Sequence, residues 1–339
     1  MRLPLSSYPH PENEMELEAP VPFDFNVNLD YLLRSPNECL YHIQGGAIHK
    51  AAMLPGSSTP AVFSLRSGES GNALSDRKPG GGTKLHIRLQ SAIADCPAAK
   101  AAPAVGPQQS IPRAQLQAGL AAYVRDWLDL DRDLLPFYAM AEQDPLLRPL
   151  VQRYYGLRIM GIPDLFEALC WGIIGQQINL PFAYTLKKRL VETFGSSVKS
   201  DAGRLWLFPE PETIASLTVG DLTPLQLTTR KSEYLIGVAR LMADGELSKA
   251  MLLEYGDTQA IARKLTGIRG IGPWTAHYVM MRCLRRPDAF PIDDAGLHNA
   301  LKDALGLAAK PDKALISKLA SGWSGWEAYA AFYLWRRLY

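Results

Sequence analysis

Cysteine is scarce and scattered in this chain of 339 residues. Its four cysteines, at positions 39, 96, 170 and 283, form no Cys-x-x-Cys pair and no cluster. Zinc ribbons, iron–sulfur clusters and disulfide frameworks need closely spaced cysteines, so the sequence argues against all three and predicts reduced, mostly buried thiols. The six histidines form no His-x-x-x-His or His-x-x-Glu-His pattern, and a histidine-ligated metal site therefore has little support.

Long apolar runs are also missing. No run approaches the roughly 20 residues that span a bilayer, and the first 20 residues lack the apolar centre of a secretory signal. We therefore expect a cytoplasmic protein with no membrane partner, nucleoid-associated in a bacterium or nuclear in a eukaryote. The hydrophobic fraction of 47% and charged fraction of 21% are ordinary for a soluble globular protein, and the length predicts two or three domains.

The chain has no strong excess of either charge. Its net charge of +2 is too small to indicate nucleic-acid binding by itself. Local basic clusters occur at Lys187-Lys188-Arg189, at Arg230-Lys231 and at Arg282, Arg285 and Arg286. Solvated helix faces explain each cluster at least as well as a binding site does.

Composition divides the chain into three parts. Residues 1–20, rich in proline and glutamate, are expected to form a flexible acidic arm. Residues 21–110 are expected to form a small α+β domain, because segments 41–43, 60–66 and 84–89 alternate as the strands of an antiparallel sheet do. Within this domain, 67–83 predicts a long loop and the Ala- and Pro-rich stretch from 91 predicts a linker. Residues 111–339 are predicted to be helical almost throughout.

The strongest local pattern lies at residues 265–301. Asp257 stands at a capping position for the helix before it, and Gly270-Ile271-Gly272-Pro273 indicates a tight turn that leads into a second helix. Pro273 suits the first position of that helix. The sequence thus predicts a helix, a glycine hairpin and a helix, and the free N–H groups at the start of the second helix could hold a phosphate.

The second helix carries two predicted faces. Trp274, Tyr278 and Met281 share one face, and Asp293 and Asp294 follow at the apparent start of another helix. The other face has the spacing of a core face: Ala276, Val279, Met280 and Cys283. A phosphate-binding hairpin beside aromatic side chains and a carboxylate indicates a candidate catalytic site. Plain capping of the helix is the structural alternative for both aspartates.

A polar loop, Gly175-Gln176-Gln177-Ile178-Asn179, follows an apolar helix predicted after Asp164. The functional interpretation is a loop inserted into DNA. The structural interpretation is a helix end whose carbonyls are capped by amides, and the local chemistry alone favours this second interpretation.

In this order, the motifs resemble the helix-hairpin-helix DNA glycosylase superfamily, and most closely its 3-methyladenine DNA glycosylase II (AlkA) type. The resemblance rests on the hairpin, on the helix start Trp274-Thr275-Ala276-His277-Tyr278 and on Asp293-Asp294, with further matches at 174–176, 208–211 and 323–335. It covers residues 115–339 clearly and the N-terminal part more loosely. The implied fold is α+β: an N-terminal antiparallel-sheet domain followed by an all-α helix-hairpin-helix region of two helical subdomains.

The resemblance implies a monofunctional glycosylase of base excision repair. Such an enzyme flips an alkylated base, 3-methyladenine foremost and also 7-methylguanine, out of double-stranded DNA and hydrolyses its N-glycosidic bond. Asp294 matches the catalytic aspartate, which stabilises positive charge on the sugar, whereas Asp293 is expected to cap the helix. Trp274, Tyr278 and Trp335 match the aromatic pocket that attracts a cationic base. A place in the core is the alternative for these aromatic residues.

The resemblance also implies contacts with the DNA backbone. Gln177 occupies the position of the side chain that plugs the duplex, with Ile178 able to share this role. The remaining DNA-binding positions are Gln176, Gly270, Gly272 and Thr275. A monovalent cation, Na⁺ or K⁺, would be held by the carbonyl groups of Thr266, Ile268 and Ile271. No other cofactor is expected, and the protein is expected to be a monomer.

Two departures narrow the chemistry. Gln177 stands where the family member has a leucine, and Trp274 stands where bifunctional relatives carry a lysine nucleophile. Schiff-base chemistry and strand cleavage are therefore not expected. Two alternatives remain open: a glycosylase for oxidised or deaminated bases, and a non-catalytic protein that binds DNA of a particular structure.

Overall fold

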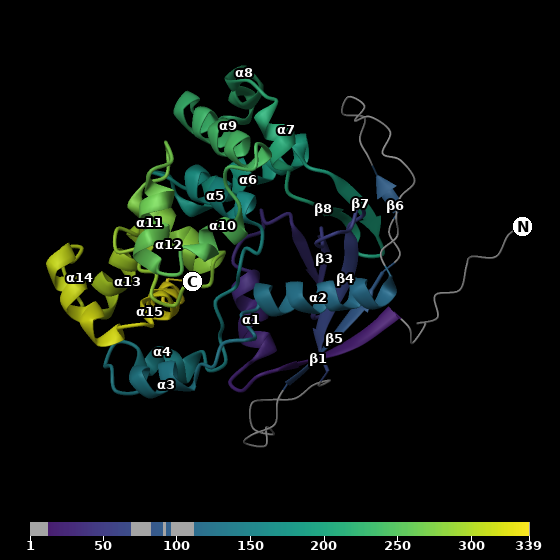
Figure 1. Cartoon of the computed structure of the whole chain (residues 1–339). Coiled ribbons are helices and arrows are strands. Elements are labelled where there is room, and N and C mark those ends of the chain that lie inside the picture. Colours follow the sequence, from purple (N-terminus) through teal and green to yellow (C-terminus); the bar gives the residue numbers. More distant parts are fainter. Residues whose placement is uncertain (1–12, 69–82, 91–92, 96–111, 339) are drawn as a thin grey trace, which may run out of the picture.

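The computed structural model describes residues 13–68, 83–90, 93–95 and 112–338. A sheet domain formed by the N-terminal part lies beside a larger helical region (Figure 1). Most of the loop predicted at 67–83 and of the predicted linker lies outside the described residues, as do the first 12 residues of the predicted arm. Among the described helices, none is both long enough and apolar enough to cross a bilayer.

The N-terminal sheet is antiparallel, as predicted. Its five strands run in the order β1-β5-β4-β3-β2. Their bounds are β1 Glu14–Ala19, β2 Tyr41–Gln44, β3 Ala47–Ala52, β4 Ala61–Ser67 and β5 Thr83–Leu89. The segments predicted at 41–43, 60–66 and 84–89 correspond to β2, β4 and β5. The fully buried side chains of Phe63, Leu65, Leu85 and Ile87 form the centre of this sheet's core face.

Strand β1 corrects the prediction of a flexible arm over residues 1–20. Glutamates at 14, 16 and 18 alternate with apolar residues, and alternate side chains of a strand point to opposite faces. Leu17 and Ala19 are buried, whereas Glu16 is exposed and forms an ion pair with Lys84 of β5 at 2.8 Å. The acidic composition concealed a strand whose charges all lie on the solvent side.

A second, three-stranded antiparallel sheet was not predicted. It consists of β6 (Ile93–Asp95), β7 (Ser197–Ser200) and β8 (Gly203–Trp206). Residues 93–95 were assigned to the linker, and this part of the prediction is wrong because they pair with β7. Buried Val198, Leu205 and Leu207 pack against Ala51 of β3 and Val62 of β4, so this sheet covers part of the first.

Two helices complete the sheet domain. They are α1 (Phe25–Leu32) and α2 (Arg113–Trp127), and α2 lies across the five-stranded sheet in Figure 1. Tyr123 of α2 packs on Phe63 with ring centroids 6.2 Å apart, and Trp127 packs on Tyr41 at 6.0 Å. The first helix of the predicted helical region therefore packs on the N-terminal sheet.

The helical region forms two groups, in agreement with the expected subdomains. Helices α3, α4 and α13–α15 lie together at the lower left of Figure 1, and α5–α11 lie above them. The bounds are α3 Leu135–Ala141, α4 Arg148–Arg153, α5 Leu165–Ile174, α6 Leu180–Phe194, α7 Pro211–Ala215, α8 Val219–Leu222, α9 Thr229–Ala243, α10 Lys249–Glu254, α11 Thr258–Thr266, α12 Pro273–Arg282, α13 Ala295–Ala304, α14 Lys313–Ala320 and α15 Glu327–Trp335. The overall class is α+β.

Helix α12 lies between the two groups of helices (Figure 1) and carries the first residues of the candidate site. It packs closely on α5, because a Cβ added at Gly172 would lie 2.6 Å from the Cγ2 methyl group of Thr275. The two helices next to α12 have the N-terminal caps that the sequence predicts. At the start of α5, Asp164 accepts a hydrogen bond from the N–H of Glu167, and at the start of α11, Asp257 accepts one from the N–H of Ala260. Packing among α5, α11 and α12 thus fixes the position of the hairpin.

Candidate active site

The glycine hairpin has the predicted form. Helix α11 ends at Thr266, a turn follows, and α12 begins at Pro273. The N–H of Ile271 donates to the carbonyl of Ile268 at 3.0 Å. Gly270 has a φ of +94°, and a Cβ there would lie 2.3 Å from the ring of Tyr234 on α9. Only glycine fits this position without displacement of the neighbouring helix.

Alanine at Gly270 is expected to destabilise the hairpin strongly. It combines an unfavourable backbone conformation with a steric clash, which together should cost about 2–4 kcal/mol in the free energy of unfolding. Gly272→Ala is the matched control, since Gly272 has a φ of −84° and its Cβ would meet no atom within 4 Å. Urea unfolding of both variants checks this. Equal stability of the two variants would contradict the role given to Gly270.

The start of α12 presents backbone donors. Its first helical bond runs from the N–H of Ala276 to the carbonyl of Gly272 at 2.9 Å. The N–H groups of Trp274 and Thr275 come before this bond and have no partner within the helix. Thr275 as a whole residue is only 1% exposed, and its hydroxyl accepts a hydrogen bond from Nε2 of Gln176. A contact of Thr275 with DNA therefore stays a prediction.

The glutamine loop is attached to the hairpin. Nε2 of Gln176 donates to the carbonyl of Gly270 at 2.9 Å, so this side chain joins two protein segments. Gln177 is exposed and has a φ of +57°, which places it at the turn of the loop. The carbonyl of Ile174 accepts from Nζ of Lys231 at 2.7 Å, so a lysine caps this helix end and the predicted capping amides do not.

Asp294 lies at the centre of the candidate site. Oδ1 accepts from Nε1 of Trp335 at 2.8 Å and from the N–H of Leu297 at 2.7 Å, whereas Oδ2 accepts from Nε1 of Trp274 at 2.8 Å. Both carboxylate oxygens are therefore held by indole donors. Asp294 is also the cap of α13, which corrects the expectation that Asp293 has this role. Asp293 points outward and pairs with Lys313 at 2.5 Å.

The three predicted aromatic residues come together beside this carboxylate. The Tyr278 ring lies 5.6 Å from that of Trp274 and 6.3 Å from that of Trp335, at interplanar angles near 30°. Tyr278 and Trp335 are each 6% exposed, and Trp274 is half-buried. A role in the hydrophobic core would explain why these three aromatic residues are buried or half-buried. It would not explain why two indole N–H groups point at one carboxylate.

Several basic residues predicted on solvated faces are buried instead. Lys231 is one of them. Lys187 binds the carboxylates of Glu38 and Glu167 at 3.1 Å, and Arg282 donates to the carbonyl of Met160 at 2.6 Å and to the hydroxyl of Tyr278 at 3.0 Å. Sequence reasoning missed these roles because their partners lie far away along the chain. The one available signal was spacing, since Trp274, Tyr278 and Arg282 are four residues apart.

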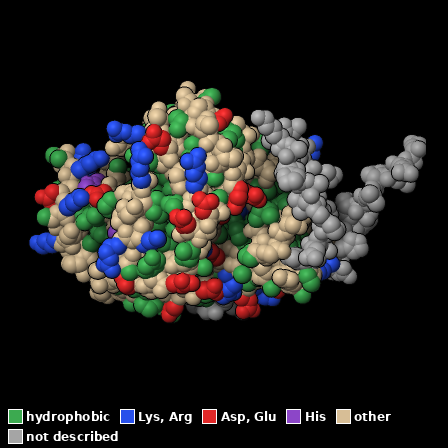
Figure 2. Space-filling view, turned by 45° about the horizontal axis from the view of Figure 1, so that its top comes forward, with side chains coloured by type: hydrophobic (Ala, Val, Ile, Leu, Met, Phe, Trp, Pro, Cys, Tyr) green, Lys and Arg blue, Asp and Glu red, His purple; other side chains and the backbone are tan. Residues whose placement is uncertain are grey.

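The exposed basic residues lie mainly over the helical region. On the face shown in Figure 2, Lys and Arg side chains are more frequent on the left, the side of α11–α14. Arg269, in the hairpin turn, has a side chain that is 78% exposed and pairs with Glu233. The carbonyls of Thr266, Ile268 and Ile271 lie in the same turn. That of Ile268 already accepts one N–H and retains a second lone pair, so the cation site stays a prediction.

Comparisons with known proteins identify the family. Residues 170–324 match the HhH-GPD superfamily of base excision DNA repair proteins, and residues 108–169 match the N-terminal domain of 8-oxoguanine DNA glycosylase. A DNA-3-methyladenine glycosylase of Bacillus subtilis is 44% identical over 312 residues, which are 92% of this chain and 93% of that protein. This chain belongs to the HhH-GPD superfamily.

Two solved structures share the fold over most of the chain. The 3-methyladenine DNA glycosylase of Archaeoglobus fulgidus superposes with a TM-score of 0.70 at 20% identity, covering 95% of this chain and 97% of that one. The 8-oxoguanine glycosylase/lyase of Clostridium acetobutylicum, in complex with double-stranded DNA, gives 0.64 at 18% identity, covering 92% and 90%. At these identities the likeness establishes the fold alone.

Proposed function

We propose that this protein is a monofunctional DNA glycosylase that removes alkylated bases, 3-methyladenine and also 7-methylguanine, from double-stranded DNA in base excision repair. The observation that carries the proposal is the Asp294 carboxylate, held by two indoles beside an aromatic wall and next to a glycine hairpin. The resemblance to the Bacillus subtilis glycosylase over nearly the whole chain supports the same substrate class.

The chemistry follows from charge. As the N-glycosidic bond breaks, positive charge develops on the sugar, and a fixed carboxylate stabilises that transition state. The Trp274 and Trp335 indoles and the Leu297 N–H prevent the carboxylate from rotating, so Asp294 needs little reorganisation during the reaction. An N-alkylated purine is already cationic and leaves without protonation. Water completes the hydrolysis, and the DNA keeps an abasic site.

The aromatic residues bind the base. Trp274 and Tyr278 are in direct ring contact, so a flipped base stacks on their outer faces and does not enter between them. Electron-rich faces attract a cationic ring with about 0.5–2 kcal/mol per contact. Trp274 carries no amine, so a Schiff base at this position is excluded and the strand is expected to stay intact.

The hairpin and the loop hold the duplex. The backbone N–H groups of Trp274 and Thr275, together with the turn at Gly270 and Gly272, are the proposed phosphate contacts, with Na⁺ or K⁺ at the neighbouring carbonyls. Gln177 is proposed to fill the space that the flipped base leaves, while Gln176 keeps its loop fixed to the hairpin. We further propose that the protein acts as a monomer on chromosomal DNA, in the nucleoid of a bacterium or in the nucleus of a eukaryote.

Chromatography of the bases released from methylated duplex DNA tests the proposed function. Free 3-methyladenine and 7-methylguanine are expected, with no strand cleavage before alkali. Release of only oxidised or deaminated bases from suitably damaged DNA would favour the alternative specificity. Binding of damaged duplex without release of any base would make the protein a non-catalytic DNA-binding protein.

Replacement of either tryptophan by phenylalanine tests whether the indole hydrogen bonds position the Asp294 carboxylate. Trp274→Phe and Trp335→Phe keep an aromatic ring but each removes one N–H bond to the carboxylate, so the base-release rate should fall about tenfold or more. Duplex affinity should stay nearly unchanged, because the hydrogen bond positions a catalytic group. Trp326→Phe is the control, since its ring packs on Phe137 and Tyr329. Weaker binding with an unchanged catalytic step would contradict this role.

A further inference from the structure

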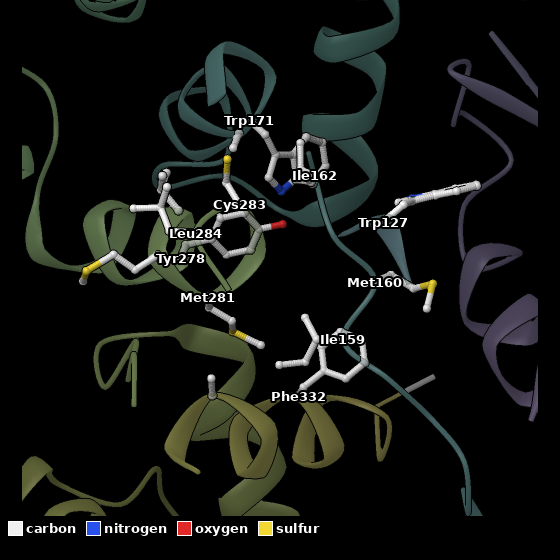
Figure 3. Close-up of a cluster of buried hydrophobic side chains, with 14 of the residues drawn as sticks. Trp127, Ile159, Met160, Ile162, Trp171, Tyr278, Met281, Cys283, Leu284 and Phe332 are labelled. Atoms are coloured by element: carbon white, nitrogen blue, oxygen red, sulfur yellow. The ribbon is translucent and has the colours of Figure 1, made fainter. Parts of the chain in front are cut away.

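A small cavity lies behind Tyr278, and we call it the inner cavity. Its volume is about 40 Å³, enough for a few water-sized groups at about 10–15 Å³ each. Residues of β2, β3, α2, α5, α6 and α12 line it, and Figure 3 shows Trp127, Met160, Ile162 and Trp171 around Tyr278. A whole purine is too large for this space, but one edge of a base can enter it.

One face of α12 connects the candidate active site with the inner cavity. Trp274, Tyr278 and Arg282 are spaced four residues apart and therefore lie in one row. Trp274 is half-buried and touches Asp294, whereas Arg282 is 4% exposed and lines the cavity. A base whose sugar lies at Asp294 and whose ring stacks on this row directs its far edge toward the cavity.

The Tyr278 hydroxyl is a hydrogen-bond donor in the wall of the inner cavity. It accepts from Nη1 of Arg282 at 3.0 Å, which leaves its own hydrogen to donate, and no described residue accepts that hydrogen. Burial raises the pKa of Tyr278 to about 12, so the hydroxyl stays protonated at neutral pH. In Figure 3 its oxygen points toward the side on which Trp127 and Met160 lie.

The walls of the inner cavity carry more positive than negative side chains. The four cations are Arg34, Lys50, Lys187 and Arg282, and the two carboxylates are those of Glu38 and Glu167. Both carboxylates are bound to Lys187, at 3.1 Å. The surplus of cations favours an oxygen acceptor in the cavity over the hydrogens of an amino group.

We propose that the inner cavity receives the C6 edge of the flipped purine, and that the Tyr278 hydroxyl, supported by Arg282, selects a carbonyl oxygen there. A 6-oxopurine such as 7-methylguanine then makes a contact that a 6-aminopurine such as 3-methyladenine cannot make. The polarity fits, because the alkylated imidazole ring carries the positive charge near Asp294 and the carbonyl lies at the opposite end. This inference rests on the proposed function.

Tyr278→Phe tests whether the hydroxyl selects a carbonyl oxygen, because the change keeps the stacking ring and removes only the hydrogen-bond donor. We expect the ratio of initial rates, 7-methylguanine over 3-methyladenine released from the same methylated duplex, to fall about tenfold. Arg282→Lys keeps the charge but cannot reproduce the three guanidinium contacts, which are with the Met160 carbonyl and the hydroxyls of Tyr31 and Tyr278, so its ratio should fall as well. Tyr255→Phe, at a residue 46% exposed, is the control and should leave the ratio unchanged.

The outcomes are distinct. A lower ratio in folded Tyr278→Phe, as judged by circular dichroism, supports the inference. An unchanged ratio there overturns it, even if both rates decrease together. If Tyr278→Phe does not fold, the ratio in Arg282→Lys decides in the same way. Failure of the wild-type protein to release either base would overturn the proposed function, and this inference with it.

Discussion

Asp294→Asn is expected to lower the rate of base release by at least about 10²–10³-fold while binding to damaged duplex persists. The amide removes the negative charge that opposes the developing sugar cation. It also places an NH₂ group opposite an indole N–H, because both carboxylate oxygens of Asp294 accept from indoles. Asparagine is as good a helix cap as aspartate, so α13 should stay folded.

Asp293→Asn is the matched control for this variant. It is the adjacent residue with the same change, but its side chain is exposed and pairs with Lys313. Its rate should stay within about twofold of wild type, because exposed ion pairs contribute little. Single-turnover base release and duplex affinity, measured on both variants, check the prediction. Near-normal release by Asp294→Asn would contradict the mechanism.

Lys187→Met is expected to lower the free energy of unfolding by about 3–5 kcal/mol. Lys187 is the buried cation between Glu38 and Glu167, and its loss removes the ammonium that binds both buried carboxylates directly. Burial alone would raise the pKa of Glu38, but the Lys187 ammonium and the N–H of Leu40 hold that pKa below its ordinary value. Urea unfolding at pH 7 measures the effect.

Acid should reduce the difference between Lys187→Met and wild type. In wild type, the lowered pKa of Glu38 contributes stability above the unfolded value of about 4.3, and this contribution is lost as the pH falls through the folded pKa. In the variant, burial favours the neutral carboxyl, so protonation stabilises the folded state. Lys188→Met, next in sequence with a side chain 41% exposed, should cost less than about 1 kcal/mol. Equal loss in both variants would contradict this account.

The hairpin and its partners could be predicted because their signals are local. Glycine before proline, aromatic residues four apart and an aspartate at a helix start all lie within about thirty residues, and the structure brings Trp274, Tyr278 and Asp294 together. The sequence could not show whether Asp293 or Asp294 caps α13, because a shift of the helix start by one residue changes which of them is the cap. Strand β1 was hidden because its glutamates suggested disorder and its pairing partner, β5, lies about 70 residues away.

The buried charges could not be predicted from the sequence alone. Lys187 looks like part of an exposed basic cluster, but its partner Glu38 lies 149 residues before it. The same holds for Lys231, whose ammonium caps the end of α5, 57 residues earlier. A charged side chain is buried only where distant segments supply its partners, and no local pattern records them. The inner cavity could not be predicted for the same reason, because its walls come from segments that lie far apart in the sequence between Leu32 and Arg282.

The central claim is that a carboxylate, without an amine nucleophile, releases an alkylated base and leaves the strand intact. A single-turnover time course tests it most directly, with excess enzyme on a duplex that carries one 7-methylguanine. Free base and strand length are measured in the same samples. We predict that free base appears at a rate equal to that of alkali-labile sites, with no cleavage before alkali. Strand cleavage without alkali, or abasic sites absent from a fully bound duplex, would contradict the account.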